Sequence, residues 1–403
     1  MSVPLLDVKI QNAPLREELE AAFRRVLDSG RFILGPEVEE LESQIAVMTG
    51  AKHAIGVSSG TDAILLALMA LDIGPGDEVL CPTFTFFATA GCVARTGATP
   101  IFVDADPANF NIDLEDAASK VTERTKAIIP VHLFGQAADM DGVLGLAKEH
   151  GLRVIEDAAQ SLGAGYKGKQ VGGIGDFGTF SFFPSKNLGG FGDGGMLVCN
   201  DDRLAGKAHI LRTHGSKPKY YHKYIGGNFR LDPLQAALLQ IKVPHYGKYT
   251  ENRQANAAYY TEKLSQLPGV AAQPSTDNQQ PAILLPIPGE DRHHIWNQYT
   301  LRVLDPKGAT AAGENPRDRL KAFLADKNIG SEIYYPVCMH EQECFTTRFP
   351  DNTWTSIRKG DAYPDGVAPR LAKECLSIPI YPELTREQQD EVISAIGEWL
   401  GPQ

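Results

Sequence analysis

Short apolar runs alternate with helix-like segments between about residues 50 and 200, and this alternation limits the folds open to the chain. The strand-like runs are EVLCP, TPIFVD, KAIIPVHLF and LRVIED. Segments with helical spacing of apolar residues separate them, for example residues 140 to 149. The pattern predicts a mainly parallel sheet that is covered by helices on both faces.

The length of the chain and a change in its pattern predict two domains. At 403 residues the chain exceeds the size at which a single hydrophobic core stops growing. Residues 271 to 318 are rich in Pro, Gln and Asp around the strand-like run NQYTLRV, and residues 319 to 403 alternate helices with short strands. We therefore expect a large domain at residues 1–250, with an N-terminal helical segment interrupted at Gly35-Pro36, and a small C-terminal α/β domain at residues 251–403.

The overall charge and composition argue against several classes of protein. A net charge of -11 makes a surface for nucleic acid unfavourable, because phosphate binding needs clustered Lys and Arg. The chain has no apolar stretch of about 18 residues and no signal-like N-terminus, so we expect no membrane partner and a cytoplasmic location. The six cysteines form no C-x-x-C pair, and the neighbouring His293 and His294 have poor geometry for one metal ion, so we expect no metal site.

Two motifs place polar residues where a strand ends. Ser58-Ser59-Gly60-Thr61-Asp62-Ala63 follows the apolar run HAIGV and opens an apolar helix, an arrangement that directs free N–H groups at an anion. Val154-Ile155-Glu156-Asp157 ends a strand on an acid, which should face the ligand crevice of an open α/β sheet. Helix capping is an alternative role for the polar residues of both motifs.

A third motif, Thr179-Phe180-Ser181-Phe182-Phe183-Pro184-Ser185-Lys186, places one lysine among aromatic and small residues. Such surroundings lower the pKa of a lysine toward that of a nucleophilic amine, although an isolated lysine is more often a surface charge. Two nearby stretches, residues 173–178 and 190–195, fit the dinucleotide fingerprint G-x-G-x-x-G. Neither follows a first strand and opens a helix, so we interpret both as turns beside the lysine.

Taken in order, these motifs resemble the DegT/DnrJ/StrS-type nucleotide-sugar aminotransferases, which depend on pyridoxal 5'-phosphate (PLP). The resemblance covers nearly the whole chain, and the matching segments are RFILGPEVEELE, SSGTDA, PTFTF, IIPVHLFGQ, EDAAQS, FSFFPSKNLGG, GDGG, GGNFRLDPLQAA and YYPVCMH. It implies fold type I, with a mainly parallel sheet of the seven-stranded type in the large domain. It also implies a homodimer whose active sites are shared across the interface.

The resemblance further implies a role for each of ten residues. Lys186 would form the Schiff base with PLP, and Asp157 would pair with its pyridine nitrogen. The other expected cofactor contacts are Gly60, Thr61 and Ser181 at the phosphate, Phe86 on the ring, Gln160 near the phenolic oxygen, and Asn228 reaching the phosphate from the partner subunit. Tyr335 and His340 lie where relatives place groups near the sugar or the cofactor, but His340 could equally be structural.

Some relatives replace the lysine by histidine and dehydrate sugars, whereas this chain keeps Lys186, which favours transamination. The expected reaction moves an amino group from an amino acid to the keto group of a nucleotide-linked sugar, and L-glutamate is the expected donor. Two alternatives are a regulatory or sensor protein on the PLP fold and an NAD-dependent sugar-nucleotide oxidoreductase. The nucleotide, the sugar and the position of the ketone stay open.

Overall fold

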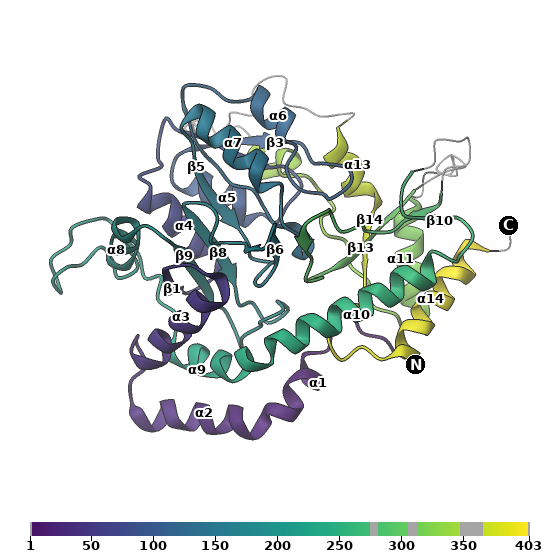
Figure 1. The fold of residues 1–403 in the computed structure, drawn as a ribbon, viewed down its shortest axis with the longest axis horizontal. Helices are drawn as coiled ribbons and strands as arrows, with labels where there is room; N and C mark the ends of the chain where they lie inside the picture. The colour runs from purple at the N-terminus through teal and green to yellow at the C-terminus, as the bar shows by residue number, and fades with distance from the viewer. Residues whose placement is uncertain (1, 275–280, 305–312, 314, 347–365, 402–403) are drawn as a thin grey trace.

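The computed structural model describes residues 2–274, 281–304, 313, 315–346 and 366–401 (Figure 1). Its largest sheet has seven strands, whose spatial order is β1 (His53–Val57), β9 (Gly195–Cys199), β8 (Phe177–Ser181), β5 (Arg153–Asp157), β4 (Thr125–Ile128), β2 (Glu78–Pro82) and β3 (Thr99–Val103). Strand β9 runs antiparallel to β1 and β8, and the remaining neighbours are parallel. The prediction of a mainly parallel sheet is confirmed.

Successive side chains of the central strands enter two different cores, as the two-residue period of a strand requires. Val154 and Val198 belong to one core, while Ile155 and Leu197 belong to the other. The first face packs against α3 (Pro36–Thr49), α6 (Leu114–Ser119), α7 (Met140–His150) and α9 (Pro233–Lys242). The second face packs against α4 (Gly60–Ala70), α5 (Ala88–Arg95) and α8 (Asp202–Leu211). The expected helices on both faces are therefore present.

The N-terminal segment forms α1 (Val8–Asn12) and α2 (Arg16–Ser29) before α3 begins. Helix α2 packs on α9 through a stripe of apolar residues at helical spacing. The expected break is present, because Gly35 has a φ of 102° and Pro36 is the first residue of α3. Proline is well suited to that position, where its missing N–H has no helical partner.

A second unit is built around a smaller sheet. Its strands, in spatial order, are β10 (Val270–Ala271), β11 (Ile283–Leu284), β13 (Tyr299–Val303) and β14 (Cys375–Ile378). The helices of this unit are α10 (Tyr246–Leu264), α11 (Pro316–Asp326), α13 (Val367–Glu374) and α14 (Arg386–Leu400), whereas α12 (Glu343–Thr346) packs through Phe345 on Cys81 and Phe102 of the large sheet. A third sheet joins β12 (Arg292–His293) to β6 (Gly165–Tyr166) and β7 (Lys169–Gln170).

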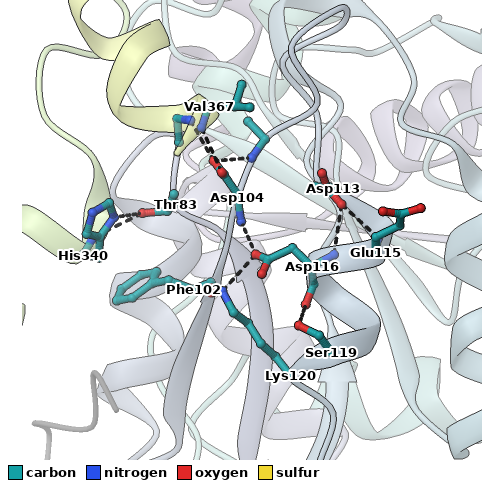
Figure 2. Close-up of polar contacts among 12 residues, drawn as sticks. Thr83, Phe102, Asp104, Asp113, Glu115, Asp116, Ser119, Lys120, His340 and Val367 are labelled. Carbon is teal, nitrogen blue, oxygen red and sulfur yellow. Dashed lines mark hydrogen bonds and ion pairs between the residues drawn. The ribbon is translucent and has the colours of Figure 1, made fainter. Parts of the chain in front are cut away.

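The two units are joined by continuous structure around the predicted boundary. Residue 250 lies inside α10, whose Tyr246 packs in a core of the large sheet and whose Tyr260 packs in the core of the small sheet. The carboxylate of Asp104, which follows β3, accepts hydrogen bonds from the N–H groups of Val367 and Ala368 at 2.9 and 2.7 Å (Figure 2). This contact caps the first turn of α13 from the large domain.

Within the described ranges, no helix combines the length and the apolar character that crossing a bilayer would require.

Candidate active site

A cavity of about 470 Å³ lies at the carboxyl ends of β5 and β8, and it brings together most of the predicted site residues. Eight of the ten line it, namely Gly60, Thr61, Phe86, Asp157, Gln160, Ser181, Lys186 and Tyr335. Parallel strands place their carboxyl ends at one edge of the sheet, so residues that follow different strands meet there. Asn228 and His340 do not line this cavity.

One end of the cavity is formed by the start of α4. Ser59 caps this helix by accepting a hydrogen bond from the N–H of Asp62 at 3.0 Å. The first N–H groups of any helix lack a helical partner, and the helix dipole is positive at this end. A Cβ on Gly60 would lie 2.8 Å from the Cβ of Ser181, so only glycine allows the two segments to approach this closely. The arrangement suits an anion such as a phosphate, and the capping role of Ser59 is compatible with it.

The acid of the site, Asp157, is the last residue of β5 and is 5% exposed. Burial raises the pKa of its carboxyl group, and a hydrogen bond from Thr89 is the strongest effect that opposes this rise. Residues 158 to 164 form turns and no helix, so Asp157 does not have the helix-capping role that was the alternative.

Lys186 lies in the loop between β8 and β9 and is half-buried. Burial lowers the pKa of its amine to about 8, although the charge of Asp157 acts in the opposite direction. The loop is held on both sides of the lysine. The N–H of Lys186 donates to the carbonyl of Phe183 at 2.8 Å, and Lys242 Nζ donates to the carbonyl of Gly189 at 2.7 Å. A neutral amine is therefore readily formed at a fixed place in the cavity.

Aromatic and amide groups form the opposite wall. The rings of Phe86 and Tyr335 lie 6.2 Å apart, and Phe86, which lines the cavity, is 57% exposed. Gln160 Nε2 donates to the hydroxyl of Tyr335 at 3.0 Å, while Gln160 Oε1 accepts from the N–H of Phe134 at 2.6 Å. Gln160 thus links the loop that follows β5 to Tyr335, 175 residues later in the chain.

The ring of His340 forms a hydrogen bond with the side chain of Thr83. Its Nδ1 lies 2.5 Å from the hydroxyl of Thr83, and Figure 2 shows the ring facing that residue. His340 is 8% exposed and belongs to a short 3₁₀ segment. Of the two roles that the sequence left open, this contact favours the structural one.

Asn228 is exposed and pairs with Thr213 in an isolated bridge, so it is free to meet another chain.

The glycine stretch at residues 173–178 binds a buried carboxylate of the chain itself. The N–H groups of Ile174 and Gly175, and that of Gly172 just before the stretch, donate to the carboxylate of Glu156 at 2.6 to 2.8 Å. Glu156 is fully buried and also lies 2.9 Å from His132 Nε2. Both fingerprint-like stretches lead into strands, β8 and β9, and neither opens a helix. The expectation that neither stretch is a dinucleotide fingerprint is confirmed.

Sequence reasoning missed several residues of the site. Phe183, Asp193, Gln298 and Tyr334 also line the cavity, and Thr89 contacts Asp157 from α5. Gln298 lies 138 residues from Gln160, and no local spacing indicates that they share a cavity. Among the residues that the structure describes, no cluster of His, Cys, Asp or Glu could hold a metal ion.

Comparison with known proteins gives one consistent result. The model of the DegT/DnrJ/EryC1/StrS aminotransferase family matches residues 14–397. The chain is 47% identical to the Pleiotropic regulatory protein of Geobacillus stearothermophilus, over 99% of each chain. It is 42% identical to the UDP-N-acetyl-3-dehydro-alpha-D-glucosamine 3-aminotransferase of Acidithiobacillus ferrooxidans, over 99% of this chain and 98% of that one. The crystal structure of DesV from S. venezuelae in complex with a ketimine intermediate superimposes with a TM-score of 0.87 at 40% identity, covering 100% of this chain and 99% of that one.

Proposed function

Because this chain belongs to the DegT/DnrJ/EryC1/StrS aminotransferase family, we propose that it moves an amino group from an amino acid to the keto group of a nucleotide-linked sugar. L-glutamate is the donor we expect. The observation that carries the proposal is the pairing of Lys186, whose pKa is lowered to about 8, with the buried acid Asp157 in one cavity. Perturbed ionisable groups of this kind gather at catalytic sites.

The cofactor of this family is pyridoxal phosphate, and the cavity fits it. The close approach of Gly60 to Ser181 at the start of α4 leaves a helix terminus and two hydroxyls, of Thr61 and Ser181, for its phosphate. Asp157 would hold the ring nitrogen and Phe86 would cover the ring face. When bound, the cofactor supplies an aldehyde carbon for amines and a ring that stabilises the charge left when the α-proton of the donor is removed.

Residues of the chain would transfer the proton, keep the ring nitrogen protonated and orient the bound molecules. The amine of Lys186 is about half neutral near pH 8, so it can take a proton from the donor and return it to the product. The carboxylate of Asp157 would keep a proton on the ring nitrogen. Gln160 holds the hydroxyl of Tyr335 at the cavity wall, where it can orient a bound ring or sugar.

Because all six cysteines are free, we also propose a reducing, cytoplasmic setting.

Two half-reactions test the proposal. We expect excess L-glutamate to convert the bound cofactor to its pyridoxamine form. After the amino acid is removed, only the right nucleotide-linked keto sugar should restore the pyridoxal spectrum. A panel of UDP- and dTDP-sugars with the ketone at C3 or C4 identifies the acceptor, and the free keto sugar and the nucleotide alone are controls. Conversion by glutamate without recovery by any sugar nucleotide would contradict the proposed acceptor class.

A regulatory role is a second candidate, because one relative is named Pleiotropic regulatory protein. The same assay separates the two functions. A regulator needs to bind its ligand but does not need to turn it over. Steady formation of amino sugar with many turnovers per site would support the enzyme, whereas binding without turnover would favour the regulator.

We further propose that the active unit is a homodimer in which Asn228 completes the site of the partner subunit. The support is that Asn228 is exposed and does not line the cavity of its own chain. Closed two-fold assembly is the commonest arrangement of soluble oligomers.

Mixing two inactive variants tests this shared site. Lys186→Ala and Asn228→Ala chains, each nearly inactive, should regain activity when they are unfolded and refolded together. Random pairing makes about half of the dimers mixed, and each mixed dimer has one intact site, so about a quarter of wild-type activity is the ceiling. A double variant refolded with itself is the control and should stay inactive. If tagged heterodimers form but activity does not return, Asn228 does not serve the partner.

A further inference from the structure

The side chain of Asp157 is held by few partners for a buried carboxylate. The hydroxyl of Thr89 donates to Asp157 Oδ2 at 2.7 Å, and the N–H of Ala159 donates to Oδ1 at 3.2 Å. The main chain of Asp157 is anchored separately, through the carbonyl of Pro130 and the N–H of His132. The orientation of the carboxylate, as distinct from that of its backbone, therefore depends strongly on the Thr89 hydroxyl.

Thr89 uses its hydroxyl in an unusual way for a helical threonine. Helical threonines commonly donate to the carbonyl three or four residues earlier, as Thr49 and Thr261 do here. Thr89 is fully buried in the first turn of α5, and its hydroxyl reaches across to the acid at the end of β5. Such a hydrogen bond to a charged group is stronger than one between neutral groups.

The position of Thr89 also connects the acid to the aromatic wall of the cavity. Its N–H donates to the carbonyl of Phe86 at 3.4 Å, in the turn that leads into α5. Phe86 and Asp157 both line the cavity, and Thr89 contacts both residues. Thr89 therefore lies between the main chain of Phe86 and the side chain of Asp157.

We propose that Thr89 is a positioning residue, whose hydroxyl orients the carboxylate of Asp157 and keeps it ionised so that it can hold the protonated ring nitrogen of the cofactor. This inference rests on the proposed function, since it concerns the same acid. Burial favours the neutral form of this carboxyl group, and the hydrogen bond from Thr89 is the strongest effect that favours the charged form. Thr89 itself does not line the cavity, so it acts through Asp157.

The chain contains a closely matched control. Thr179 is also fully buried, and its hydroxyl donates to the main-chain carbonyl of Glu156, next to Asp157, at 3.1 Å. Thr89→Val and Thr179→Val therefore remove the same group from the same depth, but only the first removes a bond to the carboxylate. Valine keeps the shape of threonine, so neither variant opens a cavity.

The readout is the ¹⁵N chemical shift of the pyridine nitrogen in bound ¹⁵N-labelled pyridoxal phosphate. We expect Thr89→Val to move this shift toward that of a neutral pyridine nitrogen and to slow α-proton exchange from glutamate about tenfold. Thr179→Val should keep the wild-type shift. If Thr89→Val and Thr179→Val give the same shift as the wild type, the inference is wrong.

A second pair of variants and a measurement on the ligand-free protein test the role of Thr89 independently. If valine at position 89 does not give folded protein, Thr89→Ser and Thr89→Ala replace it, since they differ only in the hydroxyl. Serine should restore the wild-type nitrogen shift and alanine should not. In the ligand-free protein, infrared spectroscopy of the carboxyl groups, assigned with Asp157→Asn, should show more protonated Asp157 in Thr89→Val than in Thr179→Val. A wild-type protein that does not bind the cofactor would contradict the proposed function, while this ligand-free measurement would still decide the role of Thr89.

Discussion

Replacing Lys186 with alanine is expected to lower turnover by at least about 1,000-fold, because the change removes the group that transfers protons in both half-reactions. The lowered pKa of Lys186 is the physical reason to assign proton transfer to this lysine. An amine with a pKa of about 8 is half neutral at pH 8. A lysine at the usual value of about 10.4 is only about 0.4% neutral at that pH.

The measurement is the rate of amino sugar formation with saturating donor and acceptor. Lys169→Ala is the control, because Lys169 is an exposed lysine on β7 and should be dispensable. Borohydride reduction of the wild type should attach the cofactor to the peptide that contains Lys186. Turnover of Lys186→Ala within tenfold of the wild type, or attachment to another peptide, would contradict the assignment.

The parts of the site that the sequence predicted are those that depend on local pattern. Asp157 ends an apolar strand, Gly60 opens an apolar helix, and both facts can be read from a few neighbouring residues. The rule that carboxyl ends of parallel strands meet at one edge then brings them together without further information. Lys186 was reached in the same way, from the aromatic and small residues on either side of it, while the roles of Phe86 and Gln160 came from the family resemblance.

The parts that the sequence did not predict depend on contacts between distant residues. Thr83 and His340 are 257 residues apart, and Gln160 and Tyr335 are 175 apart. Thr89 looks like an ordinary polar residue in a small-residue helix until the fold brings α5 beside the end of β5. Helical periodicity likewise shows that α10 has a buried face, but it does not show that the face passes from one core to another between Tyr246 and Ala257.

The charge of Asp157 can be tested separately from its shape by replacing it with asparagine. We expect α-proton exchange from glutamate to fall by at least about a hundredfold, equivalent to about 2.7 kcal/mol of transition-state stabilisation. The local contacts can survive the change. The asparagine oxygen can accept from the N–H of Ala159, and its amide can donate to Thr89, whose hydroxyl also accepts. Cofactor should therefore still bind.

The stability of the ligand-free variant should change in the opposite direction to its activity. Burial raises the pKa of Asp157 in the folded state, so the folded protein holds this proton more tightly than the unfolded chain does. At pH values above that raised pKa, the ionised carboxylate lowers the free energy of unfolding, and asparagine removes this cost. The Tm of ligand-free Asp157→Asn at pH 7 should thus equal or exceed that of the wild type.

Measuring exchange and Tm together separates a chemical role of Asp157 from a structural one. Asp141→Asn is the control, because Asp141 is exposed on α7 and pairs with Lys167, which lowers the pKa of its carboxyl. That variant should keep wild-type exchange and should not gain stability. Unchanged exchange in Asp157→Asn would mean that the acid is structural. A joint fall of Tm and exchange would mean that the lost activity reflects a damaged fold. Reduced exchange with an undiminished Tm and with cofactor still bound would mean that the charge itself serves the reaction.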